Sequence, residues 1–242
     1  MLMNYAANLL AIETRIAAAC DRVGRQRKGV QLLAVSKGQS PQSIRALADE
    51  GLLAFGENKV QEAKAKISSC PSQLRWHMIG HLQSNKCRDA VVLFDFIQGV
   101  DGLALAQELE KWAQKLGRTK KILLEVNVGG EGSKYGLAPT DVVQTLLRVN
   151  DLPHLEVHGL MTIAPYSPDP EHSRGFFRKM AEVKLACENA IGAPLPHLSM
   201  GMSGDFEVAI EEGSTLVRIG TALFGARTTP KTLMEHPSNE ID

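Results

Sequence analysis

A lysine that follows an apolar run is the first candidate for chemistry in this sequence. Lys37 comes directly after residues 32–36, which read Leu-Leu-Ala-Val-Ser. If this run is a strand that ends at the mouth of a barrel, the charged form of the amine loses hydration there. The pKa of the amine then falls, and the free amine can attack an aldehyde. Taken alone, the segment is better explained by a solvated lysine past a strand end, because most lysines are exposed.

Two glycine-containing turns are candidates for holding a phosphate. Residues 199–203 read Ser-Met-Gly-Met-Ser and can cap a helix that begins near Gly204, while Gly220 and Thr221 open a second turn. Small residues there leave backbone N–H groups free to approach an anion. Phosphate sites of barrels are frequently made by the loops after strands 7 and 8. Either turn taken alone is better explained as an ordinary glycine turn.

Arg218 lies inside an apolar segment, between Val217 and Ile219. A buried arginine must be paired or hydrogen-bonded. For a lone buried arginine, a structural ion pair with a carboxylate such as Glu125 or Asp205 is the simpler explanation, because an unpaired buried charge is costly.

His77 and His81 are four residues apart, a spacing that suggests a metal site. Ile79 and Gly80 are expected at a strand end, where this spacing does not place both rings on one helix face. Neither a carboxylate nor a third histidine is close in sequence, and zinc sites need more ligands. We therefore expect no metal site.

Apolar segments that alternate with helical patterns indicate the fold. Strands are predicted at residues 30–36, 52–56, 75–79, 94–100, 121–128, 155–163, 197–200 and 215–219, and helices at 41–50, 59–67, 84–90, 103–116, 140–149, 171–190 and 206–211. An additional helix is expected near residues 4–23. These units fit an α/β fold, a (β/α)8 TIM barrel with an extra N-terminal helix. A doubly wound open sheet is the alternative.

In a barrel, functional residues belong at the carboxyl ends of the strands, which is where Lys37 and both turns fall. We expect one domain over residues 1–242, with a core of about 5–227 and a frayed tail after Gly225.

Composition restricts the classes of function. The 242 residues are 44% hydrophobic, and 27 basic residues balance 27 acidic ones, so no electrostatic footprint for nucleic acid is present. The four cysteines form no C-x-x-C pair, which favours reduced thiols in the cytoplasm. We expect neither a signal peptide nor a membrane span. We expect the protein to be a monomer.

Six segments together resemble one family. They are AVSK at 34–37, FGENKVQE at 55–62, WHMIGHLQSNK at 76–86, HGLMTI at 158–163, LSMGMSGDFEVAI at 198–210 and VRIGTALFG at 217–225. They look like the signature blocks of the YggS/PROSC family of pyridoxal 5′-phosphate (PLP)-binding, or PLP-homeostasis, proteins, and they occur in the expected order.

The resemblance implies a barrel like the N-terminal domain of alanine racemase, with PLP held as an internal aldimine on Lys37. The phosphate would be held around Ser199, Gly201, Gly220 and Thr221. The remaining implied ring contacts are those of Arg218 with the pyridine nitrogen and of Asn58, Met78 and Ile79 with the ring. A guanidinium at that depth can also reach the phosphate, so both contacts of Arg218 stay open.

Three classes of function follow from the resemblance. The first is a PLP-homeostasis protein that buffers or delivers the cofactor to apo-enzymes and exchanges with free amino acids. The second is a racemase-like enzyme, for which Tyr166 is the only plausible second acid/base, and which we disfavour. The third is a regulator that binds a partner protein in response to PLP, and the sequence does not separate it from the first.

Overall fold

The apolar segments of the sequence form eight short parallel strands. The computed structural model describes residues 4–132 and 135–225. The strands are β1 (Gln31–Val35), β2 (Ala54–Glu57), β3 (Arg75–Met78), β4 (Phe96–Val100), β5 (Lys120–Glu125), β6 (Leu155–Met161), β7 (His197–Ser199) and β8 (Leu216–Ile219). All eight predicted strand segments are therefore present, with ends that differ from the prediction by up to three residues.

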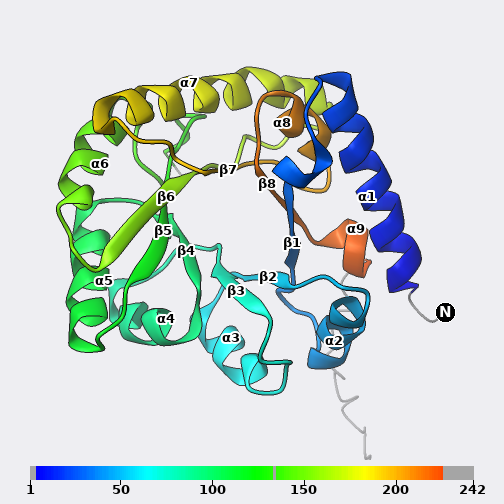
Figure 1. Ribbon diagram of the computed structural model, residues 1–242, viewed down its shortest axis with the longest axis horizontal. Helices are drawn as coiled ribbons and strands as arrows, with labels where there is room; N and C mark the ends of the chain where they lie inside the picture. The colour runs from blue at the N-terminus through cyan, green and yellow to red at the C-terminus, as the bar shows by residue number, and fades with distance from the viewer. Residues whose placement is uncertain (1–3, 133–134, 226–242) are drawn as a thin grey trace, which may run out of the picture.

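The strands close into a barrel in chain order, as Figure 1 shows. Closure comes from β1 and β8, which pair in parallel with Leu33 opposite Arg218. This pairing places the two segments that contain Lys37 and Arg218 side by side at one mouth. The predicted (β/α)8 barrel is confirmed, and the alternative of an open sheet is wrong.

Helices surround the strands (Figure 1). They are α1 (Tyr5–Arg22), α2 (Pro41–Asp49), α3 (Val60–Ile67), α4 (Cys87–Leu93), α5 (Leu103–Lys115), α6 (Val142–Asn150), α7 (Arg174–Ile191), α8 (Phe206–Glu211) and α9 (Thr221–Phe224). The additional helix α1 begins after the cap residue Asn4, whose side chain accepts a hydrogen bond from Ala7 N. It packs on α8 and α9, and an ion pair of 2.6 Å joins Arg22 to Glu211.

Helix starts were the least accurate part of the sequence prediction. The helix expected at 84–90 begins as a 3-10 turn, Ser84–Lys86, before α4, and the one expected from 171 begins as a 3-10 turn, Pro170–Ser173, before α7. The short helix α9 was not expected. The predicted tail after Gly225 lies outside the described residues.

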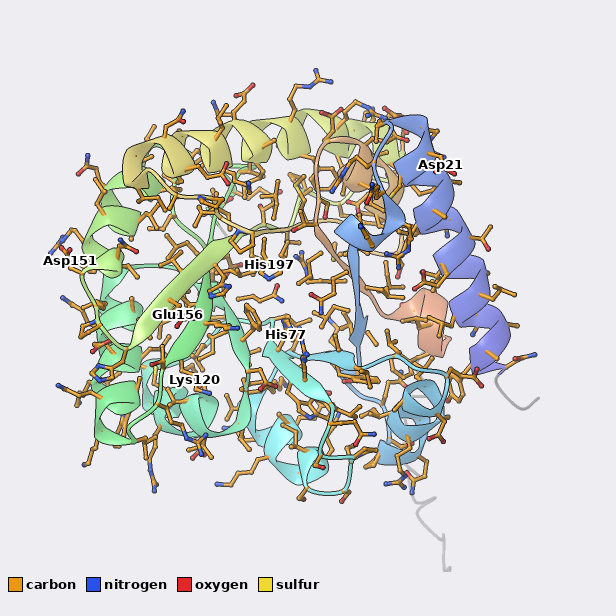
Figure 2. All side chains as sticks on the ribbon, in the orientation of Figure 1. Asp21, His77, Lys120, Asp151, Glu156 and His197 are labelled. Atoms are coloured by element: carbon orange, nitrogen blue, oxygen red, sulfur yellow. The ribbon has the colours of Figure 1, made fainter. Side chains whose placement is uncertain are left out.

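Side chains alternate along the strands between two environments, because successive residues of a strand point to opposite faces. Most buried apolar residues pack the outside of the barrel against the helices. A separate small cluster, formed by Leu33, Ala54, Ile79 and Leu216, fills part of the interior. Polar side chains fill another part, and Figure 2 shows His77 and His197 near the middle of the ring of strands.

Within the described residues, no helix is both long and apolar enough to cross a bilayer.

Candidate functional site

A pocket of about 260 Å³ opens where β1 and β8 end. The segments that follow β1, β6, β7 and β8 line it. Four of the nine residues that the resemblance assigns to cofactor binding contribute to the lining, namely Lys37, Arg218, Gly220 and Thr221. A lysine, an arginine and a glycine turn from segments far apart in the chain therefore meet at one mouth of the barrel.

Lys37 is half-buried at the rim of this pocket, one residue after the fully buried Ser36. Its neighbour Gly38 adopts φ +73, a left-handed conformation that glycine tolerates best, and turns the chain away from β1. The strand end and the turn together place the lysine at the boundary between the core and the pocket.

The turns after β7 and β8 present backbone donors to the pocket. Ser203, Gly204 and Gly220 line it, and their N–H groups donate no hydrogen bond within the residues that the structure describes. The neighbouring Met202 N–H is used locally, because it donates to Asp205 Oδ1 at 2.7 Å. Open N–H groups beside the Arg218 guanidinium suit an anion such as a phosphate.

Arg218 forms the floor of the pocket and is only 4% exposed. Its Nη1 donates to Ser199 Oγ at 2.6 Å and its Nη2 donates to Thr162 O at 2.7 Å. Burial lowers the pKa of Arg218 to about 10, which leaves it charged at neutral pH. No ion pair of Arg218 is formed among residues 4–132 and 135–225, so the ion pair weighed from the sequence is replaced by two neutral acceptors, Ser199 Oγ and Thr162 O.

A hydrogen-bond chain runs from Arg218 into the barrel interior. Because arginine only donates, the Ser199 hydroxyl accepts from it and donates onward to Gln98 Oε1 at 2.7 Å. Gln98 Nε2 then donates to His77 Nδ1 at 2.9 Å. Burial lowers the pKa of His77 to about 3, so the ring is neutral and accepts at Nδ1.

Glu125 lies on the polar side of the interior and is 8% exposed. Burial, together with the nearby Asp101, raises the pKa of its carboxyl to about 7, against the pull of Arg218. Its Oε2 has no hydrogen-bond partner within the described part of the chain. The carboxyl therefore holds a proton over part of the physiological pH range.

The two histidines that suggested a metal site lie in different environments. His77 is buried and stacks on Phe96, with 4.8 Å between ring centroids. His81 stacks on Tyr135 at 3.6 Å and lies 3.3 Å from Asp101. Over residues 4–132 and 135–225, no group of three or more candidate ligands is suitably placed for a metal ion.

Comparison with known proteins decides the family. The model of the alanine racemase N-terminal domain matches residues 7–228. The chain belongs to this family. Within it, a pyridoxal phosphate homeostasis protein of Aquifex aeolicus is 44% identical over 93% of this chain and 99% of its own length. The protein of the same name from Escherichia coli strain K12 is 38% identical over 94% of this chain and 99% of its own length. The resemblance to PLP-homeostasis proteins is thus confirmed.

Solved structures of similar proteins agree with the barrel. PipY of Synechococcus elongatus, solved with PLP bound, is 38% identical, covers 87% of this chain and is itself covered over its full length, with a TM-score of 0.76. Alanine racemase of Clostridium difficile is 17% identical with a TM-score of 0.71, and this chain spans 58% of it. The racemase shares the fold of this chain.

Five residues assigned through the resemblance do not line the pocket. Ser199 is fully buried and its hydroxyl is engaged with Arg218 and Gln98, and Met78 packs outside the barrel against the helices. Ile79 packs in the interior apolar cluster, and the backbone of Asn58 lies against Gly80, where an added Cβ would be 2.5 Å from Asn58 O. Gly201 adopts φ +93 and its backbone packs closely against α8. A Cβ atom added at Gly201 would lie 2.6 Å from the Cβ atom of Ala209.

Several residues of the site had no signal of their own in the sequence. Gln98 and Thr162 contact the Arg218–Ser199 pair. Gln98 lies in an apolar segment without a motif, and Thr162 lies in the segment HGLMTI, from which no residue was assigned to the site. Ser203 also lines the pocket. It belongs to the turn predicted at residues 199–203, but it was not itself assigned to the site. Period-two counting from Ser199 and Arg218 would have indicated which strand residues face inward.

Proposed function

We propose that this protein binds PLP in the pocket beside β1 and β8 and serves PLP homeostasis by buffering and delivering the cofactor. The observation that supports this most directly is the pocket itself, which combines the Lys37 amine, the Arg218 guanidinium and two turns with open N–H groups. The amine would bind the aldehyde of PLP, and the guanidinium would bind the ring nitrogen or the phosphate. The N–H groups of the turns would bind the phosphate oxygens.

Lys37 is the residue proposed to hold the aldehyde. Its amine nitrogen would hold PLP by a C=N bond to the aldehyde carbon, with the aldehyde oxygen released as one water molecule. Bound PLP supplies an electrophilic carbon and an electron-withdrawing ring. Imine formation is reversible, which suits storage and release.

The phosphate is assigned to the turns at residues 203–204 and 220–221. Hydrogen bonds from N–H groups to a charged oxygen are stronger than those between neutral groups. The resemblance assigned the phosphate to Ser199 and Gly201 as well. We propose instead that Ser199 acts by orienting Arg218 and that Gly201 shapes the turn, because neither lines the pocket.

Arg218 is assigned to the ring nitrogen or to the phosphate. The guanidinium would bind with those N–H groups that do not donate to Ser199 Oγ or Thr162 O. A charged guanidinium that donates to the nitrogen keeps it unprotonated, and the ring is then a weaker electron sink. This supports a binding protein over an amino-acid enzyme. Asn58, Met78 and Ile79 remain assigned near the ring only through the resemblance.

Proposals on partners and location complete this function. The exchange partners would be PLP-dependent apo-enzymes, free amino acids and a regulatory protein. A monomer in the cytoplasm is proposed, and the four free thiols of Cys20, Cys70, Cys87 and Cys187 support a reducing compartment.

Borohydride trapping tests the proposal. The protein loaded with PLP should absorb as an imine, and reduction should fix one pyridoxyl group on Lys37, located by peptide mass spectrometry. Lys37→Ala should take up no label at that peptide. A label on Lys59 or Lys86 in the wild type would show that the active lysine was assigned wrongly.

A further inference from the structure

One ion pair contacts the backbone on both sides of Lys37. Lys66 Nζ, from α3, donates to Ser36 O at 2.9 Å, and Glu62 Oε1 accepts from Gly38 N. Lys66 Nζ and Glu62 Oε1 are themselves 2.8 Å apart. The peptide group before Lys37 and the one after it are thus held by the same two side chains.

Lys66 has a full set of partners in a nearly dry position. Its side chain is 7% exposed, and its third acceptor is Glu57 Oε1 at 2.9 Å. Glu57, at the end of β2, is fully buried and also accepts from the Ser36 hydroxyl. A lysine ammonium has three N–H donors, so Ser36 O, Glu57 and Glu62 satisfy it completely. A buried ion needs such partners, because desolvation is otherwise too costly.

The position of these contacts has a geometric consequence for Lys37. Each peptide group is a rigid plane. The two planes that meet at the Lys37 Cα are the ones held by Lys66 at Ser36 O and by Glu62 at Gly38 N. Fixing both planes fixes φ and ψ of Lys37, and these angles set the direction in which its Cα–Cβ bond points.

We propose that Lys66 and Glu62, anchored by Glu57, are positioning residues that aim Lys37 into the pocket for imine formation. This inference rests on the proposed function, in which Lys37 holds the PLP aldehyde. Neither Lys66 nor Glu62 lines the pocket, so they act through the backbone of Lys37 and leave the phosphate and ring contacts unchanged.

The chain offers a matched control on the far side of the barrel. Glu188 of α7 accepts from Lys184 Nζ at 2.6 Å and from the backbone N–H of Leu195 at 2.8 Å, which repeats the two contacts of Glu62. Glu188→Ala therefore removes the same kind of anchor at a site that does not contact the pocket.

The test compares imine formation with binding that needs no imine. Apo-protein is mixed with PLP and the growth of the imine absorbance is timed. Affinity for pyridoxine 5′-phosphate, which lacks the aldehyde, is measured in parallel. Glu62→Ala should slow imine formation by roughly tenfold to a hundredfold, the range seen when a reacting group is misplaced, with unchanged affinity for pyridoxine 5′-phosphate. Glu62→Gln, which keeps an acceptor for Gly38 N, should fall between Glu62→Ala and wild type.

Defined outcomes overturn the inference. Imine formation by Glu62→Ala at the wild-type rate would do so, as would an equal slowing in Glu188→Ala or a matching loss of pyridoxine 5′-phosphate affinity. If Glu62→Ala does not fold, Glu62→Asp shortens the carboxylate and should show the same selective slowing. Borohydride labelling of wild type separates the two failures, since a label away from Lys37 rejects the proposed function itself.

Discussion

Arg218 Nη1 lies 2.6 Å from Ser199 Oγ, and this contact commits the serine hydroxyl to the barrel interior. The hydroxyl accepts from the guanidinium and gives its single proton to Gln98 Oε1. It therefore has no proton left for a phosphate oxygen. Ser199 lies in a motif that suggests phosphate binding, yet its geometry is that of a support for Arg218.

Ser199→Ala should weaken PLP binding by about 1–3 kcal/mol, because the buried guanidinium loses a partner. If the serine acts through Arg218, its effect and that of Arg218→Met should be non-additive in a double-mutant cycle followed by absorbance titration. Additive losses would indicate a separate phosphate contact. Ser214→Ala is the control, since Ser214 is equally buried and donates only to backbone carbonyls.

Removal of the ligand's phosphate tests the two turns. Pyridoxal should bind far more weakly than PLP, because the N–H groups of Ser203, Gly204 and Gly220 would have no charged oxygen to bind. Affinities are compared by quenching of intrinsic fluorescence or by competition with PLP. Equal affinities for the two compounds would reject a phosphate site in this pocket.

Glu125→Gln should stabilise the protein at high pH. Burial raises the pKa of the Glu125 carboxyl from its ordinary value of 4.5 to about 7, so the folded state binds more protons than the unfolded chain between these pH values. The free energy of unfolding of the wild type then falls as pH rises through this window. The advantage of the variant should be near zero below pH 4.5 and should reach at most about 3 kcal/mol above pH 7.

Urea denaturation at pH 4.5, 6 and 8 measures this difference. The exposed Glu50→Gln is the control, because it removes the same formal charge from the surface. A constant difference between Glu125→Gln and wild type across the pH range would contradict a raised pKa in the folded protein.

Incubation with L- or D-alanine should give no racemisation near the rate of a dedicated enzyme. Tyr166, the candidate second acid/base, lines the pocket but is 92% exposed, so nothing buries it against a substrate. Chiral chromatography of the amino acid after incubation measures the exchange. A rate on the order of 10 per second that disappears in both Lys37→Ala and Tyr166→Phe would restore the enzyme hypothesis.

Much of the fold could be predicted because its signals are local. The strand segments between residues 30 and 219 are apolar runs of the length that a covered parallel strand requires. Helix ends such as Gly117, with φ +59, are marked by one residue type. Short 3-10 starts such as Ser84–Lys86 escaped prediction, because they differ from an α-helix by only one hydrogen-bond step.

The site was predictable where a residue type is rare in its setting. Lys37 after an apolar strand and Arg218 inside one both stand out, and both line the pocket. Gln98 and Lys66 could not be found this way, because their contacts with Ser199 and Ser36 join segments 101 and 30 residues apart. Such contacts depend on the closure of the barrel and on the register of its strands, and a local sequence pattern predicts neither.

The last prediction concerns release of the cofactor. The pocket is formed at the mouth of the barrel by loops, and the 92% exposure of Tyr166 in its lining shows that this wall borders solvent. An imine that borders solvent can be attacked by a free amine or hydrolysed by water, so Lys37 would act as a reversible tether and the phosphate contacts would provide much of the retention. The holo-protein should therefore restore activity to an apo-aminotransferase within minutes to hours, and free amino acids should shift its absorbance without further chemistry. Recovered activity is followed beside an equal amount of free PLP without additions. A separate control repeats the holo-protein run with a carbonyl scavenger, which removes cofactor that is free in solution. If free PLP restores the enzyme fully and the holo-protein restores none, the cofactor is locked in place, and delivery would give way to a structural or signalling role for bound PLP.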